Sequence, residues 1–254
     1  MQNTSQPLAL TGTRNTRDLG GYVTENGETL QKRAFLRSDS LHNITSADAK
    51  VLEDYGVGCI IDLRFPEDIQ RLPDRVELFQ TPVQYVPISL QEPVRQKRYS
   101  DEFPPSMWEL YIWMLDDSQP EFLKIFKTML EFPDSCVLFH CAGGKDRTGM
   151  VAMLLLKLAG VDDATVIADY ALTETVMREF FILQTQDMEA RGMTVPSHIM
   201  ASPPENMEKA LAHLARYYGT SADYLCCIGL TGDEIRQLRD KMLVPRENRV
   251  CAAE

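Results

Sequence analysis

The sequence has little of what marks several protein classes. None of its six cysteines forms a Cys-x-x-Cys pair and its four histidines show no paired spacing, so we expect no metal site. No apolar run approaches the roughly 18 residues of a membrane span, and no basic segment followed by an apolar one opens the chain. We therefore expect a cytoplasmic protein without integral membrane association, whose cysteines are reduced and mostly buried in the core.

Positive charge is also scarce, since 26 Lys and Arg stand against 37 Asp and Glu and the formal net charge is -11. Such a chain repels a polyanion, which argues against nucleic acid as a partner. An anionic substrate would have to meet a local positive site. With 254 residues, 44% of them hydrophobic, the chain is long enough for a sizeable core. We expect one domain over residues 1–254.

Short apolar runs alternate with amphipathic stretches, which predicts an α/β fold with a central, mainly parallel sheet flanked by helices. The predicted strands are Ala34–Leu36, Cys59–Arg64, Gln84–Ile88 and Cys136–Phe139, with the last one central. The predicted helices cover residues 45–56, 105–115, 121–132, 150–158, 163–173, 174–191, 205–218 and 231–243. Because the stretch from about 170 to 218 is helical throughout, it is the best candidate for a helical lid or insertion.

One loop carries the strongest chemical signal. In the run FHCAGGKDRTG, Phe139 to Gly149, a strand ends at a cysteine and a helix begins within a few residues. Gly143 and Gly144 allow successive N–H groups to turn inward around an anion, and the positive end of the helix dipole points to the same place. Arg147 can bind two phosphate oxygens at once. The loop therefore predicts an oxyanion site.

Cys141 lies in the same positive surroundings, which favour a thiolate and thus a nucleophile that faces a bound phosphate. Thr148 could donate its hydroxyl to the sulfur. A cysteine alone would more often be a core residue beside an ordinary tight turn. Here cysteine, two glycines, lysine, aspartate, arginine and threonine occur together in one strand-to-helix turn, and that combination favours a catalytic site.

The loop resembles the His-Cys-x-x-x-x-x-Arg-Ser/Thr signature of the cysteine-dependent tyrosine phosphatases. It is similar in particular to the bacterial tyrosine/serine phosphatases with a Gly-Lys-Asp-Arg-Thr-Gly loop. Segments like those of that family occur along nearly the whole chain: Asn15–Gly21, Leu36–Ser38, Ile61–Arg64 and Ala168–Thr173. The resemblance implies a tyrosine-phosphatase-like fold and hydrolysis of phosphate monoesters through a phosphocysteine, without metal or cofactor.

The resemblance also implies the site residues. Cys141 would attack phosphorus and Arg147 would hold the equatorial oxygens, while Ala142, Gly143, Gly144, Lys145 and Thr148 would bind the substrate. Asp146 is the first choice for the general acid, with a salt bridge that stiffens the loop as the alternative. Asp101 and Asp116 remain competitors. We expect His140 to hydrogen-bond behind the cysteine and to tune its pKa.

Other residues are expected to support the loop rather than to react: Asp18, Arg37, Asp62 and Arg64 as braces, and Asp169 and Tyr170 as structural residues. Met177, Phe180, Phe181, Ile182 and Met188 recur at near-helical spacing. They are either core residues or part of a lid, or a surface for a lipid head group.

Three functions remain open at this stage. The leading one is a phosphatase that acts on phosphotyrosine in proteins, with phosphoserine, phosphothreonine or phosphoinositides as further substrates; Lys145 adds a cation beside the phosphate. The second is a phosphate-binding module without catalysis. The third is a cysteine-dependent sulfur or arsenate transfer enzyme.

Overall fold

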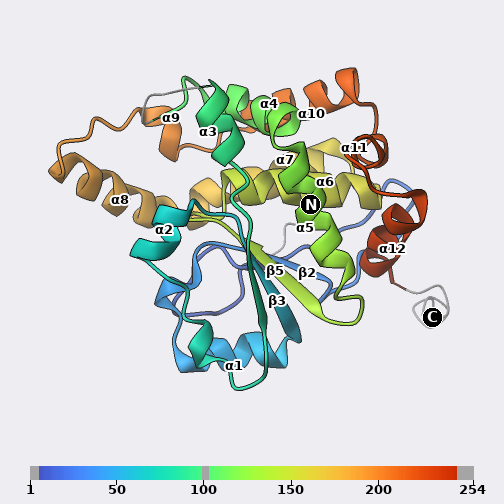
Figure 1. Ribbon diagram of the computed structural model, residues 1–254, viewed down its shortest axis with the longest axis horizontal. Helices are drawn as coiled ribbons and strands as arrows, with labels where there is room; N and C mark the ends of the chain where they lie inside the picture. Colours follow the sequence, from blue (N-terminus) through green and yellow to red (C-terminus); the bar gives the residue numbers. More distant parts are fainter. Residues whose placement is uncertain (1–5, 99–102, 245–254) are drawn as a thin grey trace.

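A central sheet organises the computed structural model, which describes residues 6–98 and 103–244 (Figure 1). Its strand order is β1-β2-β5-β3-β4, and all neighbours except β1 and β2 run parallel. The strands are β1 (Arg17–Asp18), β2 (Phe35–Ser38), β3 (Val57–Asp62), β4 (Gln84–Pro87) and β5 (Cys136–His140). The predicted α/β class, the parallel pairing and the central strand are confirmed, whereas β1 was not predicted.

The helices agree with most of the predicted ones. They are α1 (Ser46–Asp54), α2 (Pro66–Arg71), α3 (Glu92–Arg98), α4 (Met107–Asp117), α5 (Gln119–Leu130), α6 (Asp146–Ala159), α7 (Asp163–Val176), α8 (Arg178–Ala190), α9 (Ser197–Met200), α10 (Pro204–Tyr217), α11 (Ser221–Cys227) and α12 (Gly232–Met242), with 3-10 turns η1 (Leu41–Asn43) and η2 (Val76–Leu78). The predicted capping residues Thr45 and Thr231 each begin a helix with a complete capping box. Helices α2, α3, α9 and α11 were not predicted.

The sheet separates two apolar cores, because successive side chains of a strand point to opposite faces. On β5, Cys136 and Leu138 pack on the face that α1 covers, whereas Val137 and Phe139 face the opposite core. The helices from α4 onward lie mainly over this second face, with α6 among them (Figure 1). The carboxyl end of the central strand thus opens directly into a loop between the sheet and its helical layer.

Helix α6 follows this loop and anchors it. Almost all its residues are buried, as expected for a helix that is apolar on all sides. It contacts β2, β5, α7, α11 and α12. It ends at Gly160, which has the left-handed conformation (φ 91°) that favours glycine at a helix end. A helix held on all sides gives the loop before it a fixed position.

The helical stretch 170–218 divides into two environments. Helix α10 packs against α4 and α7 through buried residues such as Met207, Ala210 and Leu214. Helix α8 and the segment that follows it extend to one side of the molecule (Figure 1). The assignment of 170–218 as a lid stays a prediction.

Two general expectations can be compared with the described residues. Cys59, Cys136 and Cys141 are buried free thiols, but Cys226 and Cys227 are exposed, so the prediction of mostly buried cysteines holds for only part of the set. Cys251 lies outside the described residues. Within the described part of the chain, no helix is long and apolar enough to cross a membrane.

Candidate active site

The loop from Cys141 to Lys145 is held by its carbonyl groups. The carbonyl of Ala142 accepts a hydrogen bond from the Ser40 amide (3.1 Å), and that of Gly143 accepts one from Asn15 Nδ2 (2.9 Å). Arg37 Nη2 donates to the carbonyl of Gly144 (2.7 Å). In a trans peptide the N–H points opposite to the preceding carbonyl. Carbonyls tied outward therefore leave the N–H groups of the loop directed inward, as an anion site requires.

Two glycines allow this loop conformation. Gly144 has φ 65°, and a Cβ there would lie 2.6 Å from the carbonyl oxygen of Ser38, so a side chain is excluded by both conformation and space. At Gly143 a Cβ would lie 3.1 Å from the Phe181 ring. The glycines thus form the predicted strand-to-helix turn, which is enclosed by β2 on one side and by α8 on the other.

Cys141 lies at the carboxyl end of β5 and is only 2% exposed. Burial favours the neutral thiol, but the charge of Arg147 and the hydroxyl and amide groups of Thr148 outweigh burial and lower the pKa of Cys141. Asp146 acts in the opposite direction. The structure therefore brings together Cys141, Arg147 and Thr148 in an arrangement that favours a thiolate.

Arg147 has no charged partner among the described residues. It is 9% exposed, and its buried Nε and Nη1 atoms find no hydrogen-bond acceptor within the described part of the chain. Its guanidinium group lies 5.1 Å from the centre of the Phe65 ring. Buried arginine nitrogens are normally hydrogen-bonded, so unpaired ones beside a thiol indicate a site for an anionic ligand.

Asp146, the first residue of α6, is connected to two other helices. The Tyr111 hydroxyl of α4 donates to Asp146 Oδ1 (2.5 Å) and lies 2.7 Å from the Tyr170 hydroxyl of α7. Lys145 Nζ is 3.5 Å from the same carboxylate oxygen. Burial, followed by the charge of Asp146, raises the pKa of Tyr111, which therefore stays a donor. The side chain of Asp146 has a fixed position at the start of the helix.

The two competitors of Asp146 have different positions. Asp101 lies outside the described residues. Asp116 accepts from the Tyr218 hydroxyl (2.8 Å) and lies 2.9 Å from His213 Nε2, so its partners belong to α10 and the residue after it. None of these partners is part of the loop.

Lys145 differs from the expectation for a phosphate ligand. Its side chain is buried, and Nζ donates to the carbonyl oxygens of Ile199 and Ala201 (3.0 Å for Ala201). Nζ also lies 5.7 Å from the centre of the Phe181 ring. In this conformation the ammonium group connects the loop to α9, so its predicted contact with substrate would require these bonds to open.

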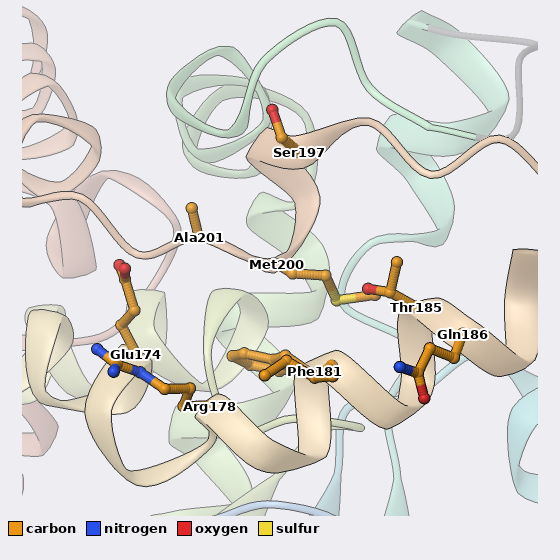
Figure 2. A pocket seen from close by; sticks show the side chains of 9 residues that line it. Glu174, Arg178, Phe181, Thr185, Gln186, Ser197, Met200 and Ala201 are labelled. Carbon is orange, nitrogen blue, oxygen red and sulfur yellow. The ribbon is translucent and has the colours of Figure 1, made fainter.

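A pocket of about 450 Å³ lies between α8 and α9. Figure 2 shows Phe181 on its floor, with Met200 and Ala201 on the opposite wall and Arg178 and Thr185 at its two ends. Of the predicted apolar series, Met177, which precedes α8, and Phe181 are buried, while Ile182 is 52% exposed. The core interpretation thus fits the buried Met177 and Phe181, whereas the exposed Ile182 is not a core residue.

Two buried ion networks flank the loop. In the Asp169 network (Arg17, Arg37 and Asp169), both arginines pair with the Asp169 carboxylate. In the His140 network (Asp62, Arg64, Asp74 and His140), Arg64 pairs with both aspartates, and His140 lies against them. Arg37 braces the loop directly, through its hydrogen bond to the Gly144 carbonyl. Arg64 reaches the loop only through Ser40, which accepts from Arg64 and whose amide donates to the Ala142 carbonyl, and Asp62 only orients Arg64.

The prediction for Asp18 is wrong. Its carboxylate accepts from the Gly20 amide (2.7 Å), the Arg33 amide (2.9 Å) and the Tyr55 hydroxyl, and none of these belongs to the loop. Because side chains alternate along β1, Arg17 points toward Asp169 while Asp18 points away from it.

Sequence reasoning assigned no role to Asn15, Phe65, Asp74 and Tyr111. Each contacts the loop or a residue that supports it, but the partners are far apart in the sequence. Tyr111 and Asp146 are 35 positions apart, and Asn15 and Gly143 are 128 positions apart. Only the segment Asn15–Gly21, noted for its resemblance, gave any signal.

The sequence model described as "Tyrosine phosphatase family" matches residues 8–244 of the chain. The chain belongs to the tyrosine phosphatase family. Over 225 residues it is 34% identical to a tyrosine-protein phosphatase of Nostoc commune, and the match covers 82% of this chain and 74% of that relative. Over 120 residues it is 27% identical to the triple specificity protein phosphatase PtpB of Mycobacterium tuberculosis, covering 42% of this chain and 44% of PtpB.

Among solved structures, TpbA of P. aeruginosa in complex with pTyr aligns with 91% of this chain and 100% of its own, at 13% identity and a TM-score of 0.43. The family predicted from the loop and its flanking segments is confirmed by the family match and the Nostoc relative. The chain is a phosphatase of the protein-tyrosine-phosphatase type.

Proposed function

We propose that this phosphatase hydrolyses phosphotyrosine in two steps, with Cys141 as nucleophile. In the first step the Cys141 thiolate forms a bond to phosphorus, the bond to the tyrosine oxygen breaks, and Asp146 gives that oxygen a proton. In the second step water attacks phosphorus, its proton passes to Asp146, and the sulfur–phosphorus bond breaks. Phosphate and the free thiolate are the products.

The observation that carries this proposal is the guanidinium of Arg147, whose Nε and Nη1 find no acceptor among the described residues, next to a buried cysteine whose pKa is lowered. A dianionic phosphate would satisfy the free nitrogens of Arg147 and the inward N–H groups of residues 143–145. Phosphoryl transfer depends mostly on positioning and on charge stabilisation, and both come from one rigid strand-to-helix turn. Thr148 would stabilise the sulfur when it leaves as a thiolate.

The test combines a trapped intermediate with a variant. Wild-type enzyme that is mixed with a ³²P-labelled aryl phosphate and quenched in acid should carry label on Cys141. Cys141→Ser should lose turnover but still bind inorganic phosphate, because Arg147 and the loop amides remain. Cys226→Ser, which removes an exposed thiol, is the control and should behave as wild type.

Each alternative function gives a different result in this test. A binding module would bind phosphopeptide without turnover in the wild type. A sulfur or arsenate transfer enzyme would need a thiol cosubstrate for activity. Turnover by Cys141→Ser at the wild-type rate would contradict the nucleophile assignment.

Phosphotyrosine is the substrate that the observed position of Lys145 favours. A phosphoinositide carries further phosphates that Lys145 could bind, but its ammonium group is bonded to the carbonyls of Ile199 and Ala201. Comparing a phosphotyrosine peptide with a soluble phosphoinositide, in wild type and in Lys145→Met, tests this preference. A selective loss of phosphoinositide hydrolysis in the variant would show that Lys145 leaves the carbonyls and binds the additional phosphate.

We also retain the lid as part of the proposal, restricted to α8 and α9. Phe181 lies over Gly143, and Lys145 holds the carbonyls of Ile199 and Ala201, so binding at the loop would be transmitted to these helices. Hydrogen exchange with and without orthovanadate tests it. Residues 178–200 should become protected, while α10, packed in the core, serves as the internal reference.

A further inference from the structure

A cluster of charged side chains lies directly behind Cys141. His140, the last residue of β5, is fully buried, and its Nδ1 lies 3.1 Å from the carbonyl oxygen of Cys141. Its other nitrogen, Nε2, lies 2.8 Å from Asp74 Oδ2 and 3.9 Å from Asp62 Oδ1. The imidazole thus connects the backbone of the cysteine to a carboxylate on another segment.

Asp74 comes from the connection between α2 and η2 and is 7% exposed. Its two carboxylate oxygens have separate partners. Oδ1 accepts from the Leu41 amide (2.9 Å) and lies 3.0 Å from Arg64 Nη2. Oδ2 and His140 Nε2 are both buried and have no hydrogen-bond partner elsewhere among the described residues. These two atoms, 2.8 Å apart, are therefore available only to each other.

The other carboxylate of the cluster is already occupied. Asp62 Oδ1 accepts from the amide and the Nε of Arg64 (3.0 and 2.9 Å). Its Oδ2 accepts from Arg64 Nη2 and the Tyr85 hydroxyl, each at 2.6 Å. Asp62 thus orients Arg64, and Asp74 is the carboxylate that directly faces the imidazole.

We propose that Asp74 is a positioning residue that keeps His140 doubly protonated beneath Cys141, so that the imidazolium stabilises the cysteine as a thiolate. The inference rests on the proposed role of Cys141 as nucleophile. An imidazolium at this place donates a hydrogen bond from Nδ1 to the carbonyl oxygen of Cys141 and puts a positive charge behind the cysteine. Nearby cations favour thiolates in the same way at other reactive cysteines.

The remaining charges around His140 agree with this protonation state. Burial of the ring and Arg64 oppose the charge, but Asp74 and then Asp62 raise the pKa of His140 to about 9. Burial followed by Arg64 lowers the pKa of His42, which stays neutral nearby. Burial raises the pKa of Asp39, whose carboxylate accepts from the amides of Arg14 and Asn15.

The same three side chains, Asp62, Asp74 and His140, offer ligand atoms within 4.8 Å of one another, as a metal site would. Here Arg64 donates to Asp62 and pairs with Asp74. With a protonated His140, two positive charges match the two carboxylates, and the cluster is neutral without an added cation. Charge balance therefore supports the imidazolium.

Asp74→Asn is the decisive variant because it keeps the Oδ1 acceptor for the Leu41 amide. It replaces Oδ2 by an NH₂ group, which requires a neutral Nε2 as acceptor and so removes the imidazolium. The pH midpoint of thiolate formation at Cys141 should rise by about one pH unit. The rate of alkylation of the thiol as a function of pH measures this midpoint. At pH below the midpoint, kcat/KM for an aryl phosphate should fall about tenfold, and above the new midpoint it should approach wild type.

A purely structural role for Asp74 predicts another result. The variant would then lose stability or activity at every pH, with an unchanged thiolate midpoint, and this outcome would overturn the inference. Asp74→Glu keeps the charge and should restore part of the shift. Asp48→Asn is the matched control, since it alters a buried aspartate that accepts backbone amides at Thr11 and Gly12, away from the loop. It should leave the midpoint unchanged.

A measurement on unaltered Asp74 covers the case of a variant that does not fold. In a chain with His42, His198 and His213 replaced by Gln, ¹⁵N NMR observes His140 alone. Both ring nitrogens should stay protonated at pH 8, and a neutral ring at pH 7 would overturn the inference. If instead Cys141 is dispensable for turnover, the proposed function fails regardless of the state of His140.

Discussion

The two ion networks flank the same loop but differ in how their charge is fixed. The Asp169 network contains two guanidinium groups and one carboxylate, and its excess positive charge is used on backbone carbonyls such as that of Gly144. Arginine is charged at every accessible pH. The His140 network contains two carboxylates and one arginine, so its balance requires a proton on His140.

This difference separates two requirements of the site. The position of the loop backbone has to be the same at every pH, and permanently charged arginines provide that. The positive charge behind Cys141 acts on a thiol that itself gains and loses a proton. His140 provides this charge. Both networks are buried, and a buried charge without its partner is costly. Removal of Asp169 leaves such charges on two arginines, whereas removal of Asp74 is compensated when His140 loses its proton.

The largest effect is expected from Asp169→Asn. The change leaves Arg17 and Arg37 buried without their common carboxylate, and we expect a loss of about 3 to 5 kcal/mol in the free energy of unfolding. The loss should be the same at pH 6 and pH 8, because neither arginine titrates there. Urea unfolding measures it. Asp54→Asn, which breaks the exposed pair with Lys50, is the control and should change little. Equal losses in both variants would contradict the assigned role of Asp169.

The His140 network should make stability depend on pH. Because the pKa of His140 is raised to about 9 in the folded protein and is about 6.5 in an unfolded chain, folding binds a proton. This contribution is complete below pH 6.5 and is lost as pH rises to about 9, by about 3 kcal/mol in total. Urea unfolding at a series of pH values should show it in the wild type.

The same series in Asp74→Asn isolates this contribution. Burial lowers the pKa of Lys241 to about 8. The contribution of Lys241 to the free energy of unfolding therefore increases as pH rises, which partly masks the decrease caused by His140. Lys241 is unchanged in the variant, so the difference between the two proteins reports on His140 together with the linked shift of Cys141. A constant difference from pH 6.5 to 9 would argue against a protonated His140.

The parts of the site that the sequence predicts are contiguous in it. Cys141 and Arg147 come together because the end of a strand, a turn and the beginning of a helix follow one another within eleven residues. The relative position of the two side chains is therefore set locally. The apolar pattern of 150–158 likewise predicts a buried helix without further information. The sheet follows from the alternation of strands and helices, although a strand of two residues such as β1 gives no pattern.

The partners of the loop could not be predicted, because long-range packing places them. Tyr111 looks like a core residue of an amphipathic helix, and only the packing of α4 brings its hydroxyl to Asp146. Asp74 lies in a connection without periodicity. Lys145 was expected to face the phosphate, but its ammonium group donates to a carbonyl of α9 instead. The four residues of α9 were not predicted as a helix.

Changes in either ion network should lower turnover of all substrates by a similar factor. A change at Asp146 should instead depend on the leaving group of the substrate, if Asp146 is the general acid. If Asp146 protonates the leaving oxygen, Asp146→Asn should lower turnover about 100-fold for phosphoserine peptide. The loss should be much smaller for an activated aryl phosphate, whose leaving group departs as a stable anion. Steady-state kinetics on both substrates decide between the two roles. Equal losses would assign Asp146 to bracing and redirect attention to Asp101 or Asp116.

The smallest effect is expected at the contact that holds Asp146. Tyr111→Phe removes the hydroxyl that donates to Asp146, while Tyr170→Phe removes a hydroxyl that bonds Tyr111 and not Asp146. Each change deletes one buried hydroxyl and should cost about 1 kcal/mol of stability, so the two variants are matched. Only Tyr111→Phe removes a hydrogen-bond donor to the Asp146 carboxylate, and we expect it alone to lower turnover of phosphoserine peptide by a few-fold. If both variants slow this substrate equally, the hydroxyl pair acts through packing between α4 and α7, and the orientation of Asp146 does not depend on Tyr111.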